Sequence, residues 1–224
     1  MCGRFTQRKP AKALEGHFGV EVPETRPSFN IAPTQNVLAI RGGDAGRDAA
    51  WLKWGLVPAW AKDASVGARL INARSETVAE KPSFREAFKK RRCLIPADGF
   101  YEWQRTGGRK QPYFFRMKDD RPFGFAGLWE RWEGEDGRVL DSCTILTTEA
   151  NEVLLPVHDR MPVILHPEEY ALWLEAGERE RALLKELLRP YPADEMVSYP
   201  VSALVNSPGN RGAELIAEAP LNSA

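Results

Sequence analysis

Short apolar runs of the kind found in β-strands recur along the chain as far as Leu165. The pattern predicts β-strands at 37–40, 50–54, 93–95, 100–103, 112–117, 123–129, 143–147 and 161–165. Turn signals separate several of these runs, Gly107-Gly108 and Asp136-Gly137 among them, which is typical of antiparallel strands. The proline-rich, polar stretch 23–33 predicts irregular chain lying on the body of the protein.

Helix signals are fewer than strand signals. A capping box formed by Ser83 and Glu86 opens one predicted helix, and a second is expected after His166. Leucines recur with helical spacing over 183–188 and predict a third. Because strands dominate and helices do not alternate with them, we expect an α+β protein. The expected architecture is a single compact domain with a mixed, mostly antiparallel sheet that closes toward a barrel or sandwich, flanked by a few helices.

Composition and charge limit the functions that this fold could carry. The chain has 224 residues, 43% hydrophobic and 28% charged, as in a soluble globular protein. No run of about 18 apolar residues exists, so we expect no membrane partner. The start, MCGRFTQRKP, lacks the apolar core of a secretory signal, so we expect a cytoplasmic protein. Basic and acidic residues balance at 31 each, so any nucleic-acid site must be a local basic patch.

Three cysteines, Cys2, Cys93 and Cys143, stand far apart in the sequence. Neither a CxxC pair nor a His/Cys cluster suggests zinc, so we expect no metal and no other cofactor. The odd number and wide spacing fit a reducing compartment. Cys93 and Cys143 lie in apolar strand runs and are expected to be buried and unreactive.

Cys2 differs from the other cysteines because it follows the initiator methionine. Aminopeptidases generally remove Met1 when the next side chain is small, which would leave Cys2 with a free α-amine beside its thiol. The reference pKa values of these groups are about 8 and about 8.5, so both have nucleophilic forms near neutral pH. With an aldehyde the amine forms a Schiff base, and the thiol then closes a five-membered thiazolidine with an effective molarity of about 10⁵ M or more. The alternative is an incidental residue on a frayed end.

Four motifs in one order resemble the SOS response-associated peptidase family: MCGRF at the N-terminus, NARSET at 72–77, CLIPADGFYEW at 93–103 and VHDRMP at 157–162. The likeness runs from Cys2 to about Pro208. It implies a single domain over 1–224, with about 209–224 as a tail. It also implies binding of abasic sites in single-stranded DNA, with a covalent thiazolidine crosslink through Cys2 that shields the lesion. Self-removal of Met1 would account for the peptidase in the family name.

The resemblance implies four catalytic residues, Cys2, Asn72, Glu102 and His158. Glu102 lies among aromatic neighbours in a predicted strand, where apolar surroundings should raise its pKa toward the range useful for proton transfer. The resemblance assigns it proton transfer at the sugar and the Schiff base. It assigns His158, with a natural pKa of about 6.5, to opening the deoxyribose ring. How the two divide this work stays open. By resemblance Asn72 orients the sugar or the Cys2 backbone, although its propensity alone favours a turn or cap.

Six residues are candidate DNA contacts: Arg4, Asn30, Trp54, Arg74, Trp103 and Arg160. The arginines each lie two residues beyond a catalytic candidate, where they could clamp phosphates. The two tryptophans could stack on bases, and the asparagine lies on the irregular chain near the terminus. Surface arginines are usually only solvated, and most of the seven tryptophans must be core, with Trp51 and Trp129 expected among them. The basic run 89–92 is interpreted as a solvated helix end.

Two other functions stay open. A thiol peptidase would use Cys2 with His158 and Asn72 in a Cys/His/Asn arrangement. A non-covalent reader of modified DNA would need the arginines and tryptophans but not the free amine. The abasic-site hypothesis makes the protein an enzyme that modifies itself, acting as a monomer in the cytoplasm and associating with the nucleoid on DNA.

Overall fold

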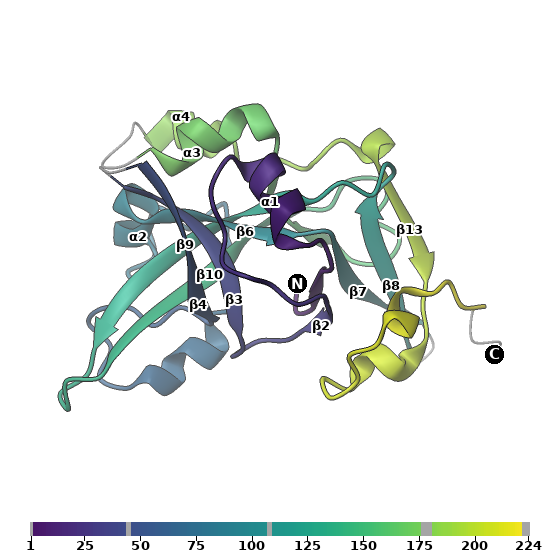
Figure 1. The fold of residues 1–224 in the computed structure, drawn as a ribbon, viewed down its shortest axis with the longest axis horizontal. Helices are drawn as coiled ribbons and strands as arrows, with labels where there is room; N and C mark the ends of the chain where they lie inside the picture. Colours follow the sequence, from purple (N-terminus) through teal and green to yellow (C-terminus); the bar gives the residue numbers. More distant parts are fainter. Residues whose placement is uncertain (1, 44–45, 107–108, 176–180, 221–224) are drawn as a thin grey trace.

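The computed structural model describes residues 2–43, 46–106, 109–175 and 181–220. Within them five strands close into a barrel (Figure 1): β3 (Asn36–Gly43), β4 (Gly46–Trp54), β6 (Arg92–Ala97), β9 (Phe123–Glu133) and β10 (Val139–Glu149). Neighbours around the ring run antiparallel except β4 and β10, which pair in parallel. The expected α+β fold, with a mostly antiparallel sheet closing into a barrel, is confirmed.

A second sheet flanks the barrel and holds the N-terminal strand. Its order is β13 (Met196–Pro200), β8 (Arg109–Met117), β7 (Gly99–Thr106), β1 (Phe5–Gln7) and β2 (Ser28–Ile31). β1 pairs with both β2 and β7, so the chain start lies in the middle of the molecule (Figure 1). The residues that precede β1 therefore lie next to β7.

Three short strands extend the barrel: β5 (Asn72–Arg74), β11 (Arg160–Pro162) and β12 (Ile164–Leu165). β5 runs parallel to β10 and β11 antiparallel to it, and both are paired with Thr147 near the end of β10. An ion pair between Glu76 and Arg160 also links the NARSET and VHDRMP motifs. The two motifs thus meet at one end of the barrel.

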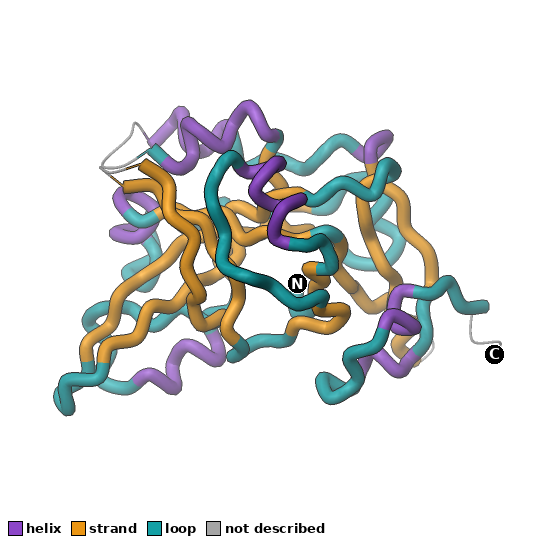
Figure 2. The backbone as a smooth tube through the Cα atoms, viewed as in Figure 1, coloured by secondary structure: helices purple, strands orange, loops and turns teal. Residues whose placement is uncertain are grey.

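Helices lie around the outside of the two sheets (Figure 2). The α-helices are α1 (Ala11–Phe18), α2 (Arg85–Lys90), α3 (Tyr170–Leu174) and α4 (Arg181–Glu186). Short 3₁₀ segments are η1 (Ala64–Arg69), η2 (Pro167–Glu169), η3 (Ala193–Glu195), η4 (Ala203–Asn206) and η5 (Ala213–Ile216). The three predicted helices correspond to α2, to η2 with α3, and to α4. In α2 the N-cap is Phe84 without a side-chain cap, so the predicted capping role of Ser83 is wrong.

Several elements were not predicted from the sequence. They are α1, β1, β5, β13 and β2, the last of which lies inside the stretch 23–33 that was expected to be irregular. The turn signal Asp136-Gly137 is confirmed, with Gly137 at a φ of 77° between β9 and β10. The signal Gly107-Gly108 lies outside the described residues.

One cluster of buried apolar side chains joins the barrel to the flanking sheet. Cys2, Phe5, Trp54, Cys93 and Cys143 all belong to it and are fully buried. Burial of Cys93 and Cys143 confirms that expectation, and it raises the pKa of both thiols. The core prediction is wrong for Trp51, which is 47% exposed, whereas Trp129 is partly buried and packs against the core.

The basic run 89–92 is only partly a solvated face. Arg92 is buried, and its guanidinium donates hydrogen bonds to the carbonyls of Phe88 and Trp173, 3.0 and 2.8 Å away. Buried arginine donors of this kind satisfy carbonyls left free at helix ends. The solvated interpretation is therefore wrong for Arg92.

The segment predicted as a tail packs against the flanking sheet as far as residue 219. Leu215 is fully buried in a cluster with Tyr101 and Phe114, and Glu218 bridges Val201. The N–H of Ala219 donates a 2.9 Å hydrogen bond to the carbonyl of Pro200 at the end of β13. No helix in the described part of the chain is both long and apolar enough to cross a membrane.

Candidate active site

Cys2 reaches the centre of the molecule because β1 pairs with β7. The N–H of Tyr101 donates a 3.0 Å hydrogen bond to the carbonyl of Arg4, just beyond the paired residues of the two strands. The same antiparallel register brings Cys2 alongside the next part of β7, where Glu102 lies. The Cys2 side chain is completely buried there.

A buried carboxylate fixes the other end of β1. Asp98 has no exposed surface and accepts hydrogen bonds from the Thr6 hydroxyl at 2.6 Å, Arg8 Nε at 2.8 Å and the Lys9 N–H at 3.0 Å. A buried charge needs this number of donors to offset its desolvation. These bonds fix the register of β1 and with it the position of Cys2.

Asn72, at the start of β5, holds the backbone of Cys2. Its Nδ2 donates a 2.9 Å hydrogen bond to the Cys2 carbonyl. Its Oδ1 is buried and has no hydrogen-bond partner among the described residues. A buried acceptor without a donor destabilises the folded state by about 1–3 kcal/mol. Such an unpartnered atom is typical of a position that binds a ligand.

Burial sets the proton states of Cys2 and Glu102. Glu102 is 3% exposed, and burial raises its pKa, opposed in part by the nearby imidazole of His158. Burial also raises the pKa of the Cys2 thiol, and the charge of Glu102 raises it further. The thiol is therefore protonated at neutral pH, and the carboxyl beside it binds a proton more readily than an exposed glutamate does.

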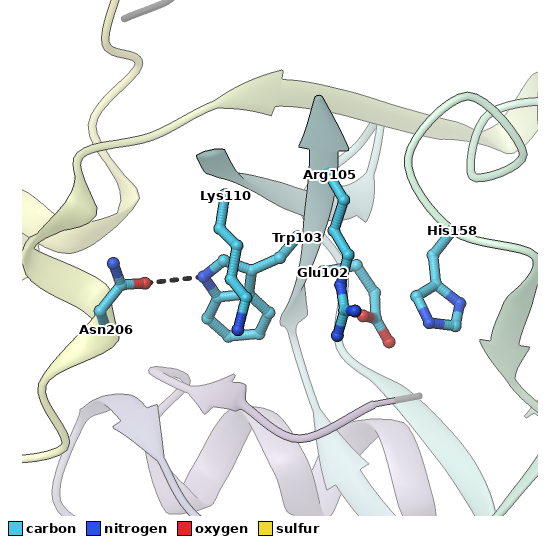
Figure 3. A pocket seen from close by; sticks show the side chains of 6 residues that line it. All are labelled: Glu102, Trp103, Arg105, Lys110, His158 and Asn206. Carbon is cyan, nitrogen blue, oxygen red and sulfur yellow. Dashed lines mark hydrogen bonds between the residues drawn. The ribbon is translucent and has the colours of Figure 1, made fainter. Parts of the chain in front are cut away.

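His158 lies beside Glu102 in the loop that precedes β11 (Figure 3). Its Nδ1 accepts a 3.0 Å hydrogen bond from the N–H of Arg160, which requires an unprotonated Nδ1. The same nitrogen lies 3.0 Å from Oδ1 of Asp159, a contact that favours a proton on it. These two contacts hold the imidazole of His158 in place beside Glu102.

Of the catalytic candidates, Glu102 and His158 line a cavity of about 490 Å³. It is lined by Glu102, Trp103, Arg105, Lys110, His158 and Asn206 (Figure 3). A second hollow of about 530 Å³ shares Trp103, Arg105 and His158 with it and therefore lies next to it. Sequence reasoning missed Arg105, Lys110 and Asn206. Alternation along the predicted strand could have placed Arg105 on the same face as Trp103.

Two of the six predicted DNA contacts are corrected. Trp54 is fully buried, and its Nε1 donates to the carbonyl of Ile71 at 2.9 Å, so its ring packs in the core and cannot stack on bases. Asn30 is 2% exposed, and its Nδ2 donates to the carbonyls of Ser207 and Asn210. It holds the C-terminal segment and has no surface left for DNA.

Two of the predicted arginine clamps have protein partners. Arg4 Nη1 donates to Oδ1 of Asn30 at 3.1 Å and to the carbonyl of Val205 at 2.8 Å. Arg160 pairs with the carboxylate of Glu76 and donates to the carbonyl of Thr147 at 2.6 Å. Phosphate contacts of these two arginines stay predictions, but the contacts seen are structural.

The remaining two candidates lie at the surface. Arg74 is exposed on β5. Trp103 lines the cavity, half-buried, with its Nε1 donating to Oδ1 of Asn206 at 2.7 Å (Figure 3). No group of His, Cys, Asp and Glu side chains in the described ranges could hold a metal ion.

The comparisons with known proteins agree over nearly the full chain. The family model for SOS response associated peptidase (SRAP) matches residues 1–208. The abasic site processing protein YoqW of Bacillus subtilis is 46% identical to this chain, and the match covers 96% of this chain and 99% of the YoqW chain. The abasic site processing protein HMCES of Mus musculus is 32% identical over 99% of this chain and 77% of its own. A crystal structure of a Bacteroides thetaiotaomicron protein superposes with a TM-score of 0.88 at 26% identity, covering 97% of this chain and 100% of that one. The chain therefore belongs to the SOS response associated peptidase (SRAP) family.

Proposed function

We propose that the protein processes abasic sites in single-stranded DNA by forming a covalent crosslink through Cys2. The observation that carries the proposal is the position of Cys2, buried beside Glu102 and held through its carbonyl by Asn72. The names of relatives such as YoqW and HMCES support the choice of lesion. The ring-opened abasic sugar is an aldehyde, the group that a neighbouring amine and thiol capture.

The reaction needs the α-amine of Cys2, so Met1 must be removed first. The amine attacks the sugar aldehyde, a C–N bond forms, and one water leaves to give the Schiff base. The thiol sulfur then attacks the imine carbon, forming the C–S bond while the thiol proton is released and the imine nitrogen gains one. The net change is loss of one water, without an oxidant or a cofactor.

The proposed roles follow from the proton states. Glu102 moves protons at the carbinolamine and takes the thiol proton, because burial raises its pKa and makes the carboxyl a better proton acceptor than an exposed glutamate. His158, which lies beside Glu102 at the cavity, opens the sugar ring. The unpartnered Oδ1 of Asn72 accepts a hydrogen bond from the amine or a sugar hydroxyl.

Mass spectrometry of the protein incubated with abasic single-stranded DNA tests the proposal. We expect a denaturation-resistant adduct, lighter by one water than the sum of the reactants, mapped to the N-terminal residue. Cys2→Ala and a form that retains Met1 should both lack it, whereas Cys143→Ala should form it. An undiminished stable adduct on Cys2→Ala would rule out the mechanism.

The thiol peptidase alternative fits the geometry less well. In a Cys/His/Asn arrangement the amide orients the histidine, whereas here the Asn72 amide donates to the Cys2 carbonyl. Burial raises the pKa of the Cys2 thiol, while peptidase cysteines work as thiolates with lowered pKa values. Self-removal of Met1 stays compatible with the crosslinker. A non-covalent DNA reader would bind intact and abasic strands equally and form no adduct.

A further inference from the structure

A pair of like charges faces the cavity from one hairpin. β7 and β8 are antiparallel, and Arg105 stands directly opposite Lys110 in their register. Directly opposite residues share a face of the sheet and have neighbouring side chains. Both side chains line the cavity that Glu102 also lines (Figure 3).

This pairing contrasts with other cross-strand arginines of the protein. In the β9–β10 ladder Arg131 stands opposite Asp141, and the two form a bidentate ion pair at 2.8 and 2.9 Å. In the β3–β4 ladder Arg41 likewise stands opposite and pairs with Asp48. Opposite charges in such positions stabilise a sheet, and like charges destabilise it.

Neither Arg105 nor Lys110 forms an ion pair within the part of the chain that the structure describes, and both are exposed at the cavity. Arg4 and Arg160, in contrast, have their guanidinium groups bonded to protein partners. The net charge of the chain is zero, so a nucleic-acid site needs a local basic patch. Two adjacent cations beside the catalytic residues provide one.

We propose that Arg105 and Lys110 jointly bind a backbone phosphodiester next to the abasic sugar. The inference rests on the proposed function and names the residues that hold its substrate. An anion between the two cations removes their repulsion, and the guanidinium can bond two phosphate oxygens. The contact would hold the strand with the sugar facing Cys2.

Two measurements on matched variants test the proposal. The first is the single-turnover crosslinking rate on an abasic strand, compared with a strand whose two flanking phosphodiesters are uncharged methylphosphonates. The second is the salt dependence of binding to an intact strand, which needs no chemistry. The variants are Arg105→Gln and Lys110→Gln. Arg131→Gln is the control, because Arg131 forms an ion pair with the residue opposite it on the neighbouring strand.

We expect Arg105→Gln and Lys110→Gln each to react on the order of tenfold more slowly with the natural strand, the effect of losing a charged hydrogen bond. Neither should slow the methylphosphonate strand further, because the charge they bind is already absent. The salt slope of binding should fall by about 1 for each variant. Arg131→Gln should match wild type in every one of these measurements.

Equal rates of Arg105→Gln, Lys110→Gln and wild type on the natural strand would overturn the proposal. An equal slowing on both strands would overturn it too, because the residues would then not act on the flanking phosphates. If the wild-type protein forms no adduct, the proposed function fails. Separately, a salt slope that Arg105→Gln and Lys110→Gln leave unchanged would overturn the phosphate-binding inference. Both variants should melt at or above the wild-type temperature, because each removes the repulsion between Arg105 and Lys110. Such melting temperatures would show that a loss of binding is not a folding defect.

Discussion

The side-chain amide of Asn72 donates a 2.9 Å hydrogen bond to the carbonyl of Cys2, joining residues 70 positions apart. The bond ties Cys2 to β5 at the end of the barrel. It leaves Oδ1 of the same amide buried and available.

Asn72→Asp should therefore slow crosslinking by tenfold or more. The variant loses the donor and places a carboxylate against the Cys2 carbonyl, which destabilises this arrangement of Cys2 by about 1–3 kcal/mol. Single-turnover rates measure this effect, and the exposed Asn36→Asp on β3 controls for added charge. Wild-type rates in Asn72→Asp would contradict a positioning role for this bond.

Glu102→Gln should change the dependence of stability on pH. Burial raises the pKa of Glu102 above its ordinary value of 4.5, so the folded protein holds a proton that the unfolded chain releases. Stability from this group is present at low pH and falls as pH rises from 4.5 through the raised pKa. Denaturant titrations should show Glu102→Gln gaining stability relative to wild type as the pH rises above 4.5, and the absence of this trend would contradict burial as the main cause of the raised pKa.

Trp54 and Trp103 should respond in opposite ways to replacement. Trp54→Ala removes a fully buried side chain and should cost about 3–5 kcal/mol of unfolding free energy. Trp103→Ala should leave stability nearly unchanged and weaken binding to single-stranded DNA by about 1–3 kcal/mol if its ring stacks on a base. Thermal melts and fluorescence anisotropy separate the two effects. A DNA defect in a folded Trp54→Phe variant would contradict its placement in the core.

The native protein should react slowly with iodoacetamide. Cys2, Cys93 and Cys143 are all fully buried, and burial raises the pKa of each thiol. Alkylation followed by mass spectrometry at about pH 8 should label fewer than one thiol in the time that labels all of them in denaturant. Rapid selective labelling of Cys2 would instead indicate an activated thiolate and favour the peptidase.

The sequence predicted the barrel because its strands are rich in apolar residues bounded by turn signals, as at Val37 to Ile40. It missed β1, β5 and β13, whose three to five residues are too short to show a period. β2 was missed because prolines and polar residues flank it in the sequence. The segment forms a strand where it pairs with β1. Short strands of this kind are fixed by their partners, which one sequence does not reveal.

The sequence motifs identified the catalytic candidates, but they did not predict which residues surround them in the fold. Sequence alone gave no reason to bury Trp54 while leaving Trp51 47% exposed. Alternation places the two on opposite faces of β4, but it does not say which face meets the core. The cavity residues Arg105, Lys110 and Asn206 come from three elements that meet only in the folded chain.

The contact between Arg4 and Val205 spans 201 positions, and Asn206 then reaches Trp103 in the cavity wall. Cys2 is therefore synthesised well before the residues that complete its surroundings. Until residues 205 and 206 are in place, the surroundings of Cys2 lack these contacts, so any chemistry that depends on an enclosed Cys2 must follow the folding of the C-terminal segment.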